Sequence, residues 1–144
     1  MSTLAADTIT NVAGSSAGTT ITIDKDSTYN SEGTAVTQNL VQGLIKVWNN
    51  FDGTASGAAS RDSFNVSSMT DNTTGTATTA FSNAMANTNY PAITIGEDDS
   101  ANQGPSGEQI TRATGSIKFE TRYQYNNTVY DLDNCHVMIS GDLA

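Results

Sequence analysis

The segment GSIKFETRYQY, residues 115–125, alternates two kinds of side chain along its length. One set of alternate positions carries Ile117, Phe119, Thr121, Tyr123 and Tyr125. The other set carries Ser116, Lys118, Glu120, Arg122 and Gln124. Because successive side chains of a strand point to opposite faces, this pattern predicts a β-strand with one apolar and one charged face. Such strands are typical of an antiparallel sheet that covers a core on one side and meets water on the other.

Several shorter segments repeat this strand signal, with turn residues between them. They are residues 63–72, 76–81, 88–97, 129–132 and 135–140. In the third, Ile93 and Ile95 alternate with other residues, and Pro91 is expected near the start of the strand or at an edge. The polar segments 52–62 and 97–109 are expected to be loops. Together with 115–125 and a strand at 44–51, these segments make roughly six or seven short strands. The sequence therefore predicts an all-β fold, a small antiparallel β-sandwich of jelly-roll-like type.

Residues 34–51 carry two competing periodicities. A helix-like spacing of four joins Val36, Leu40, Leu44 and Trp48. A strand-like spacing instead puts Ile45, Val47 and Phe51 on one face, and Lys46 and Trp48 on the other. Gly43 would weaken a helix interior by about 1 kcal/mol. We expect a short helix or a turn near 35–42, followed by a strand from about 44 to 51.

The N-terminal part of the chain is poor in large apolar side chains. Up to residue 33 they are Leu4, Ile9, Val12, Ile21, Ile23 and Tyr29, on two short strand signals at 7–12 and 19–24. A two-stranded unit this poor is marginal by itself and needs a partner surface. We therefore expect residues 1–43 to form an attachment and oligomerisation arm, and residues 44–144 to form the sandwich domain.

Charge and targeting signals exclude several classes of function. The 144 residues include 6 basic and 15 acidic ones, a net charge of −9 that repels a phosphate backbone and argues against nucleic-acid binding. The chain has one cysteine, Cys135, and so offers no internal disulfide. The N-terminus lacks the basic and apolar regions of a signal peptide, and no stretch is apolar enough to insert into a membrane. We expect a protein made in a cytoplasm.

Two features invite an enzymatic interpretation. GSSAG, residues 14–18, has the G-x-S-x-G pattern of a nucleophile elbow at Ser16, but the TTITI that follows predicts a strand where the elbow requires a helix. His136 is the only histidine, and on a strand it would point away from neighbouring Cys135, which is poor geometry for a Cys–His pair. We interpret GSSAG as a turn and His136 as a surface or interface residue, and expect neither enzymatic activity nor a cofactor.

Three acidic groups are candidates for a calcium site. They are Asp24 with Asp26, Glu97 with Asp98 and Asp99, and Asp131 with Asp133. The first begins like an EF-hand loop, but Tyr29 and Ala35 stand where that loop requires Gly and Glu. We interpret the other two as solvated acidic loops that would hold Ca²⁺ only weakly, and expect no metal site.

Trp48, the only tryptophan, could stack on a sugar or pack against protein. A tryptophan within a strand of a sandwich usually packs in the core. We interpret Trp48 as a packing residue, in the core, on the opposite face of its strand or at a subunit contact.

Several segments of the sequence resemble those of one protein family. The similar segments are QGL-x-KVW-x-NFDGT at 42–54, RDSFNVSSMTDN-x-TG at 61–75, AM-x-N-x-NY at 84–90, ATGSI at 113–117 and GDLA at 141–144. They are similar to tail-fibre-like virion structural proteins of tailed bacteriophages, especially those of marine bacteria. The opening residues 2–14 resemble the segments that begin many phage fibre proteins. This chain is much shorter than a typical fibre and has no long shaft repeat.

The resemblance implies a non-enzymatic virion protein: an external appendage of tail-fibre or head-fibre type, anchored by its N-terminal arm and displaying its sandwich. It also implies a homotrimer in contact with other virion proteins of the tail or capsid. Two alternatives remain open. One is a decoration or cement protein that stabilises the capsid, and the other is a module that binds host glycans through loops such as 97–109.

Overall fold

The computed structural model of the protein describes residues 27–30, 37–97, 105–123 and 126–144, and its regular elements are all β-strands. In chain order they are β1 (Thr28–Asn30), β2 (Thr37–Asn39), β3 (Ile45–Asp52), β4 (Ala59–Phe64), β5 (Val66–Thr73), β6 (Thr76–Phe81), β7 (Ala92–Glu97), β8 (Pro105–Ala113), β9 (Ser116–Tyr123), β10 (Thr128–Val129) and β11 (Asn134–Ser140).

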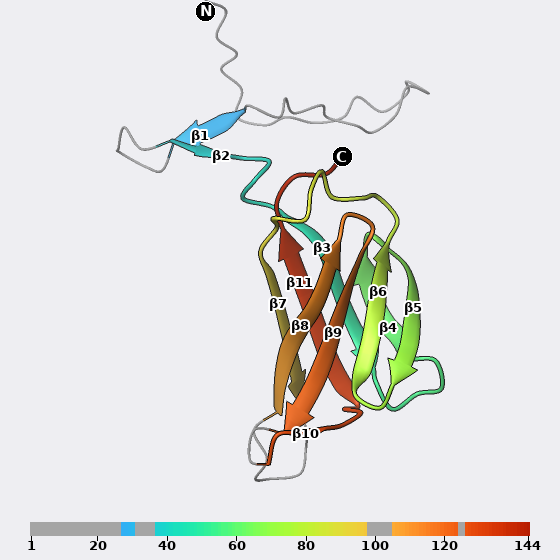
Figure 1. Ribbon diagram of the computed structural model, residues 1–144. Coiled ribbons are helices and arrows are strands. Elements are labelled where there is room, and N and C mark those ends of the chain that lie inside the picture. The colour runs from blue at the N-terminus through green and yellow to red at the C-terminus, as the bar shows by residue number, and fades with distance from the viewer. Residues whose placement is uncertain (1–26, 31–36, 98–104, 124–125) are drawn as a thin grey trace, which may run out of the picture.

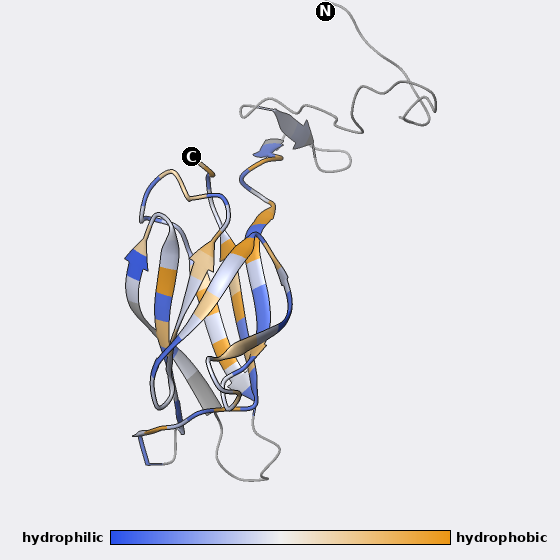
Figure 2. Ribbon diagram, turned by 90° about the vertical axis from the view of Figure 1, so that its right-hand side faces the viewer, coloured by the Kyte–Doolittle hydropathy of each residue, from blue (hydrophilic) through white to orange (hydrophobic). Residues whose placement is uncertain are grey.

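Two antiparallel sheets pack face to face (Figure 1). One sheet has the order β4-β3-β11-β7. In the other, β9 pairs with β8 on one edge and with β6 and then β10 on the other, and β5 lies outside β6. The hairpins β3–β4, β5–β6 and β8–β9 each stay within one sheet, while the chain crosses between sheets after β4, β6, β7 and β10. The predicted all-β antiparallel sandwich is confirmed, with strands that alternate in hydropathy along their length (Figure 2).

The core lies between the sheets and is formed by alternate residues of the central strands. Its largest fully buried apolar side chains are Phe51, Phe119, Met85, Ile117, Ile139, Val47 and Val137. The inward face predicted for 115–125 is confirmed for Ile117, Phe119 and Thr121, which are all buried. Fully burying each large apolar side chain contributes about 1.5–3 kcal/mol, so these strands supply most of the driving force for folding.

The predicted single strand at 63–72 is wrong, because Asn65 divides it into β4 and β5, which belong to different sheets. Asn65 has φ 58°, a left-handed conformation that Asn tolerates better than most residues. Its side chain holds the corner: Oδ1 accepts from Asn83 N at 2.7 Å, and Nδ2 donates to Lys46 O and Asn83 O, both at 3.1 Å. The corner thus fastens both sheets at one end of the sandwich.

Two segments predicted as loops contain strands, so the described residues have nine strands from β3 onward. Residues 59–62 of the expected loop 52–62 belong to β4, which lies at a sheet edge and is largely exposed. Residues 105–109 of the expected loop 97–109 belong to β8, which pairs with β9. Both are edge strands, and such strands need few apolar residues, so the periodicity in their sequence is weak.

Of the region 35–42, the structure describes residues 37–42, which form strand β2 and then a turn. The turn alternative is therefore confirmed and the helix alternative is wrong. Gly43 N donates to Asn39 O at 3.2 Å, and Leu44 N donates to Val41 O at 3.3 Å. The chain then enters β3 at Ile45, as expected, and β3 ends at Asp52.

A β-bulge near the start of β3 changes which side chains point inward. Val47 pairs with Ile139 and Ile45 pairs with Ser140, so Lys46 is an extra residue in the ladder. Lys46 is therefore buried and Ile45 exposed, and the predicted faces of these two residues are wrong. From Val47 onward the prediction holds, because Val47 and Phe51 are buried while Trp48 lies on the opposite face.

The turn Asp52-Gly53-Thr54 closes β3 through side-chain and backbone contacts. Asp52 Oδ1 accepts from Thr54 Oγ1 at 2.7 Å and from Thr54 N at 2.9 Å, and these bonds, with the charge of Arg61, lower the pKa of Asp52. Gly53 N donates to Leu132 O at 2.8 Å. A Cβ at Gly53 would lie 2.6 Å from that oxygen, so only glycine fits. The segment Asp52-Gly53-Thr54 is therefore a structural turn.

Before the sandwich, β1 and β2 form a two-stranded hairpin that projects from one end, where the C terminus also lies (Figure 1). The strand signals at 7–12 and 19–24 lie outside the described residues.

Candidate interaction surface

A row of apolar side chains crosses the outer face of the four-stranded sheet. The register pairs Phe64 with Trp48, Trp48 with Met138, and Met138 with Ile93, so the row spans β4, β3, β11 and β7. Phe64, Met138 and Ile93 are 53%, 43% and 67% exposed, and Trp48 is half-buried. Contiguous apolar surface of this kind commonly marks a contact with another protein. We call Phe64, Trp48, Met138 and Ile93 the outer row.

A shallow hollow of about 270 Å³ lies at one side of the outer row. Its lining includes Ile45, Pro91, Ile93, Met138 and Ser140. The bulge in β3 contributes to this hollow, because it turns Ile45 outward. Interfaces are commonly anchored by a side chain that fills such a recess, so the hollow suits an apolar side chain of a partner.

Polar side chains border the outer row on the side away from the hollow. Arg61 Nη2 lies 3.0 Å from Asp52 Oδ2, and Asn134 Nδ2 donates to Glu97 Oε2 at 2.6 Å. His136 Nε2 lies 3.4 Å from Glu97 Oε1. The polar groups of this border are therefore paired with one another, and Arg61 balances the charge of Asp52. An apolar centre with a polar rim is the usual composition of a protein interface.

Trp48 lies in this outer row and is absent from the buried core. The interpretation of Trp48 as a core residue is therefore wrong. The interpretation that it covers the opposite face of its strand is confirmed.

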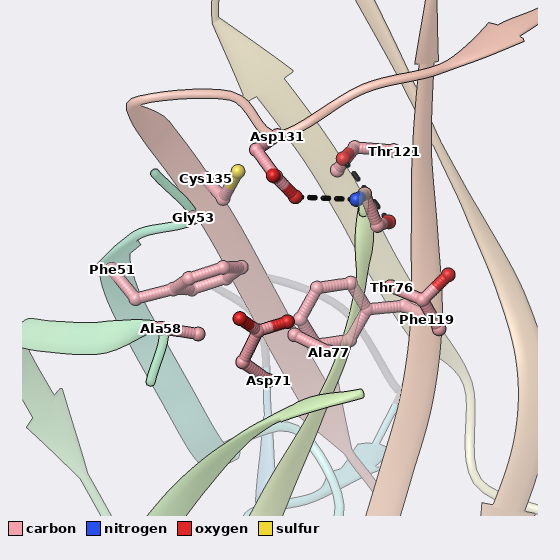
Figure 3. A pocket seen from close by; sticks show the side chains of 11 residues that line it. Phe51, Gly53, Ala58, Asp71, Thr76, Ala77, Phe119, Thr121, Asp131 and Cys135 are labelled. Carbon is pink, nitrogen blue, oxygen red and sulfur yellow. Dashed lines mark hydrogen bonds between the residues drawn. The ribbon is translucent and has the colours of Figure 1, made fainter. Parts of the chain in front are cut away.

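A small pocket of about 10 Å³ is lined by residues of both sheets (Figure 3). The rings of Phe51 and Phe119 both line it, and Gly75 N donates to a carboxylate oxygen of Asp131, which also lines it. This volume holds about one water at most, so this pocket is not a substrate site.

The structure places Cys135 and His136 as expected, on opposite faces of β11. Cys135 is buried, and His136 is half-buried on the outer face, where Asn50 Nδ2 lies 3.3 Å from His136 Nδ1. Burial, reinforced by the charges of Asp133 and Asp52, raises the pKa of Cys135 from 9.0 to about 12. Its thiol is therefore neutral and unreactive at physiological pH.

We expect a neutral maleimide to label Cys135 about a thousandfold more slowly in the native protein than in urea at pH 8, because only the thiolate reacts. The rates can be followed by mass spectrometry in each condition. Equal rates in the folded and unfolded states would contradict the burial of this thiol.

The remaining candidate residues do not form a site among the described residues. Asp131 is tied to Gly75, and Asp133 is exposed. In the parts of the chain that the structure describes, no three His, Cys, Asp or Glu residues gather as metal ligands. The candidates Ser16, Asp24, Asp26, Asp98 and Asp99 lie outside the described residues.

Sequence reasoning missed the outer row. The sequence shows that Ile93 and Ile95 alternate with other residues, but it does not show which face of this strand points inward. Both residues point outward. The inward positions of β7 carry smaller side chains, and neighbouring segments of the chain pack closely against them. A Cβ at Gly96 would overlap Leu132 Cδ1, for example. The clustering of Gly96 with Ala92 and Thr94 on one face was the available signal.

Among the residues that the structure describes, no helix is long and apolar enough to cross a membrane. Comparisons of the chain with protein-family models, with curated proteins and with solved structures find no match.

Proposed function

We propose that this chain is a non-enzymatic structural protein of a tailed-phage virion, an external appendage of tail-fibre or head-fibre type. In this proposal residues 1–43 anchor and trimerise the protein, and residues 44–144 form the displayed sandwich. The outer row carries the proposal, because four apolar side chains in register across a whole sheet suit a protein that works in contact with other proteins.

Two of the sequence segments that carry the phage resemblance overlap with this surface. The segment 42–54 covers β3 and its closing turn, and the segment 61–75 covers the end of β4, the Asn65 corner and β5. Trp48 and Phe64, two neighbours in the outer row, lie in these two segments. The resemblance and the candidate surface thus rest partly on the same residues.

Capsid decoration is the second candidate. An apolar face with a hollow at one side also suits a domain that lies flat across neighbouring capsid subunits. The glycan-binding alternative has less support, since part of the loop assigned to it is strand β8.

The proposal is tested on purified particles of the phage that encodes the chain. We expect mass spectrometry to find the protein in the particles, and a reconstruction to show it outside the tail or head with the outer row covered. Its absence from washed particles would overturn the proposal. Light scattering tests the trimer, and a protein that stays monomeric at high concentration would contradict that part. A glycan-array signal, with or without Ca²⁺, would favour the adhesin alternative.

We expect the triple variant Phe64→Ser, Met138→Ser and Ile93→Ser to reduce the occupancy of the protein on particles at least about tenfold. Each substitution removes part of the roughly 1.5–3 kcal/mol gained by burying such a side chain, and about 1.4 kcal/mol corresponds to tenfold in affinity. The control is Leu44→Ser, which alters an apolar side chain that is 52% exposed but outside the outer row. Equal occupancy of the two variants, at unchanged melting temperature, would exclude the outer row as the contact.

A further inference from the structure

Exposed apolar side chains are concentrated in one region of the protein. Among the residues that the structure describes, five large ones lie on the outer face of the four-stranded sheet, namely Ile45, Phe64, Ile93, Ile95 and Met138. Three more, Tyr29, Leu44 and Leu143, belong to the end from which the β1–β2 hairpin projects (Figure 1). Within the described ranges only Tyr130 is a large exposed apolar residue elsewhere. Apolar surface gathered in this way marks a docking surface.

The distribution of charge on this face suits a contact between identical copies. The outer row has no charged side chain, although the chain has a net charge of −9. The carboxylates of Asp52, Asp62 and Glu97 lie on the side of the row away from the hollow. Copies of an acidic chain repel one another, and near a symmetry axis each charge faces its own equivalent. An uncharged apolar centre with carboxylates on one border only is therefore what a contact between copies requires.

The same face carries a projection and a recess that can fit each other. Phe64 stands at the β4 edge of the sheet and is exposed. The hollow of about 270 Å³ lies toward the other edge, over β3, β11 and the start of β7. A cavity of roughly 150 Å³ can hold benzene, so the hollow has room for a phenyl ring. A symmetry axis that runs roughly along the strands brings the β4 edge of one copy beside the β7 side of the next.

We propose that the outer row is the contact between copies of this chain, and that Phe64 of one copy fills the hollow of the next. In the proposed trimer the outer faces turn toward a common axis, and each copy gives Phe64 to one neighbour and receives Phe64 from the other. The ring then closes with every hollow filled. The contact rests on the self-association in the proposed function, but not on the virion role.

Sedimentation and light scattering of the full-length protein over a dilution series test the contact. We expect Phe64→Ser to raise the concentration at which the copies separate at least about tenfold, because burial of the ring in the hollow is lost. Trp48, the only tryptophan, lies in the outer row, so its emission should shift to longer wavelength as the copies separate. The matched control is Tyr130→Ser, which removes an exposed aromatic ring from the other sheet and should change neither measurement.

A disulfide cross-link tests where the copies touch. The pair Phe64→Cys and Ser140→Cys places one thiol at the β4 edge and one in the hollow. Strand β3 lies between β4 and β11, so these positions are roughly 10 Å apart within one copy, too far for a disulfide. The native Cys135 is buried. We expect oxidation to link different copies, and the control pair Phe64→Cys and Tyr130→Cys to link far fewer. Equal yields from the two pairs would overturn the contact.

The outcomes distinguish this contact from the rest of the proposed function. A protein that stays monomeric at high concentration would overturn both the contact and the proposed trimer. Association that Phe64→Ser leaves unchanged would overturn the contact alone, because the copies would then be held elsewhere. Linked pairs in place of trimers would support the contact and contradict the trimer. The presence of the protein in phage particles bears on the virion role only.

Discussion

Phe119→Ala is expected to lower the free energy of unfolding by about 3–5 kcal/mol. Phe119 on β9 is 2% exposed, and its ring centroid lies 5.1 Å from that of Phe51 on β3, in the facing sheet. Truncation would enlarge the small pocket that both rings line. A domain of this size typically has about 5–15 kcal/mol of stability in total, so the variant should unfold at much lower urea concentration.

Urea titrations of Phe119→Ala, Phe51→Ala and the double variant complete the test. The tilted ring pair should give a coupling energy of about 0.5–1.5 kcal/mol, because such pairs contribute beyond the area that they bury. Phe64→Ala is the matched control, since Phe64 is also a strand phenylalanine but is 53% exposed. We expect it to cost less than about 1 kcal/mol. A control that costs as much as Phe119→Ala would mean that the core is not where the structure places it.

The central strands of the fold could be predicted because their alternation is itself the cause of their burial. In β9 every second residue packs against the facing sheet, so a period of two in the sequence is enough to identify the strand and its inward face. The same holds for Val47 and Phe51 in β3.

The edges and corners could not be predicted from local patterns. At Asn65 nothing in the apolar spacing signals that the chain changes sheets, because the break depends on a left-handed residue and its bonds to Asn83 and Lys46. At Lys46 a single bulged residue reverses which side chains point inward. Such irregularities are set by the register of the partner strand, and the sequence of one strand does not contain that register.

The candidate surface was harder to predict than the fold. The outer row exists only when four strands, separated by long stretches of chain, are aligned so that Phe64, Trp48, Met138 and Ile93 fall in one line. The individual residues were visible in the sequence, and Trp48 was singled out, but their alignment is a property of the tertiary structure.

Gly75→Ala is expected to destabilise the protein by more than about 3 kcal/mol, through two effects that act together. Gly75 has φ +65°, where a Cβ costs roughly 1–2 kcal/mol. A Cβ there would also lie 2.7 Å from Tyr130 N and 2.8 Å from Tyr130 O, and would overlap the Val129 side chain. The backbone has little freedom to move, because Gly75 O accepts from Thr121 N at 2.7 Å and Gly75 N donates to Asp131.

Two other glycines separate these effects. Gly57 has φ +86° but nothing within 4 Å of its added Cβ, so Gly57→Ala should cost only the conformational part, roughly 1–2 kcal/mol. Gly115 has open space and no positive φ, so Gly115→Ala should be neutral or should stabilise by about 0.4–1 kcal/mol, because it restricts the unfolded chain. Thermal and urea unfolding should therefore find the lowest free energy of unfolding for Gly75→Ala, a higher one for Gly57→Ala and the highest for Gly115→Ala. If Gly75→Ala proved no less stable than Gly57→Ala, the close approach of residues 129–130 to this turn would be wrong. The position of β10, next to β6 on the same edge of β9, would then be wrong as well.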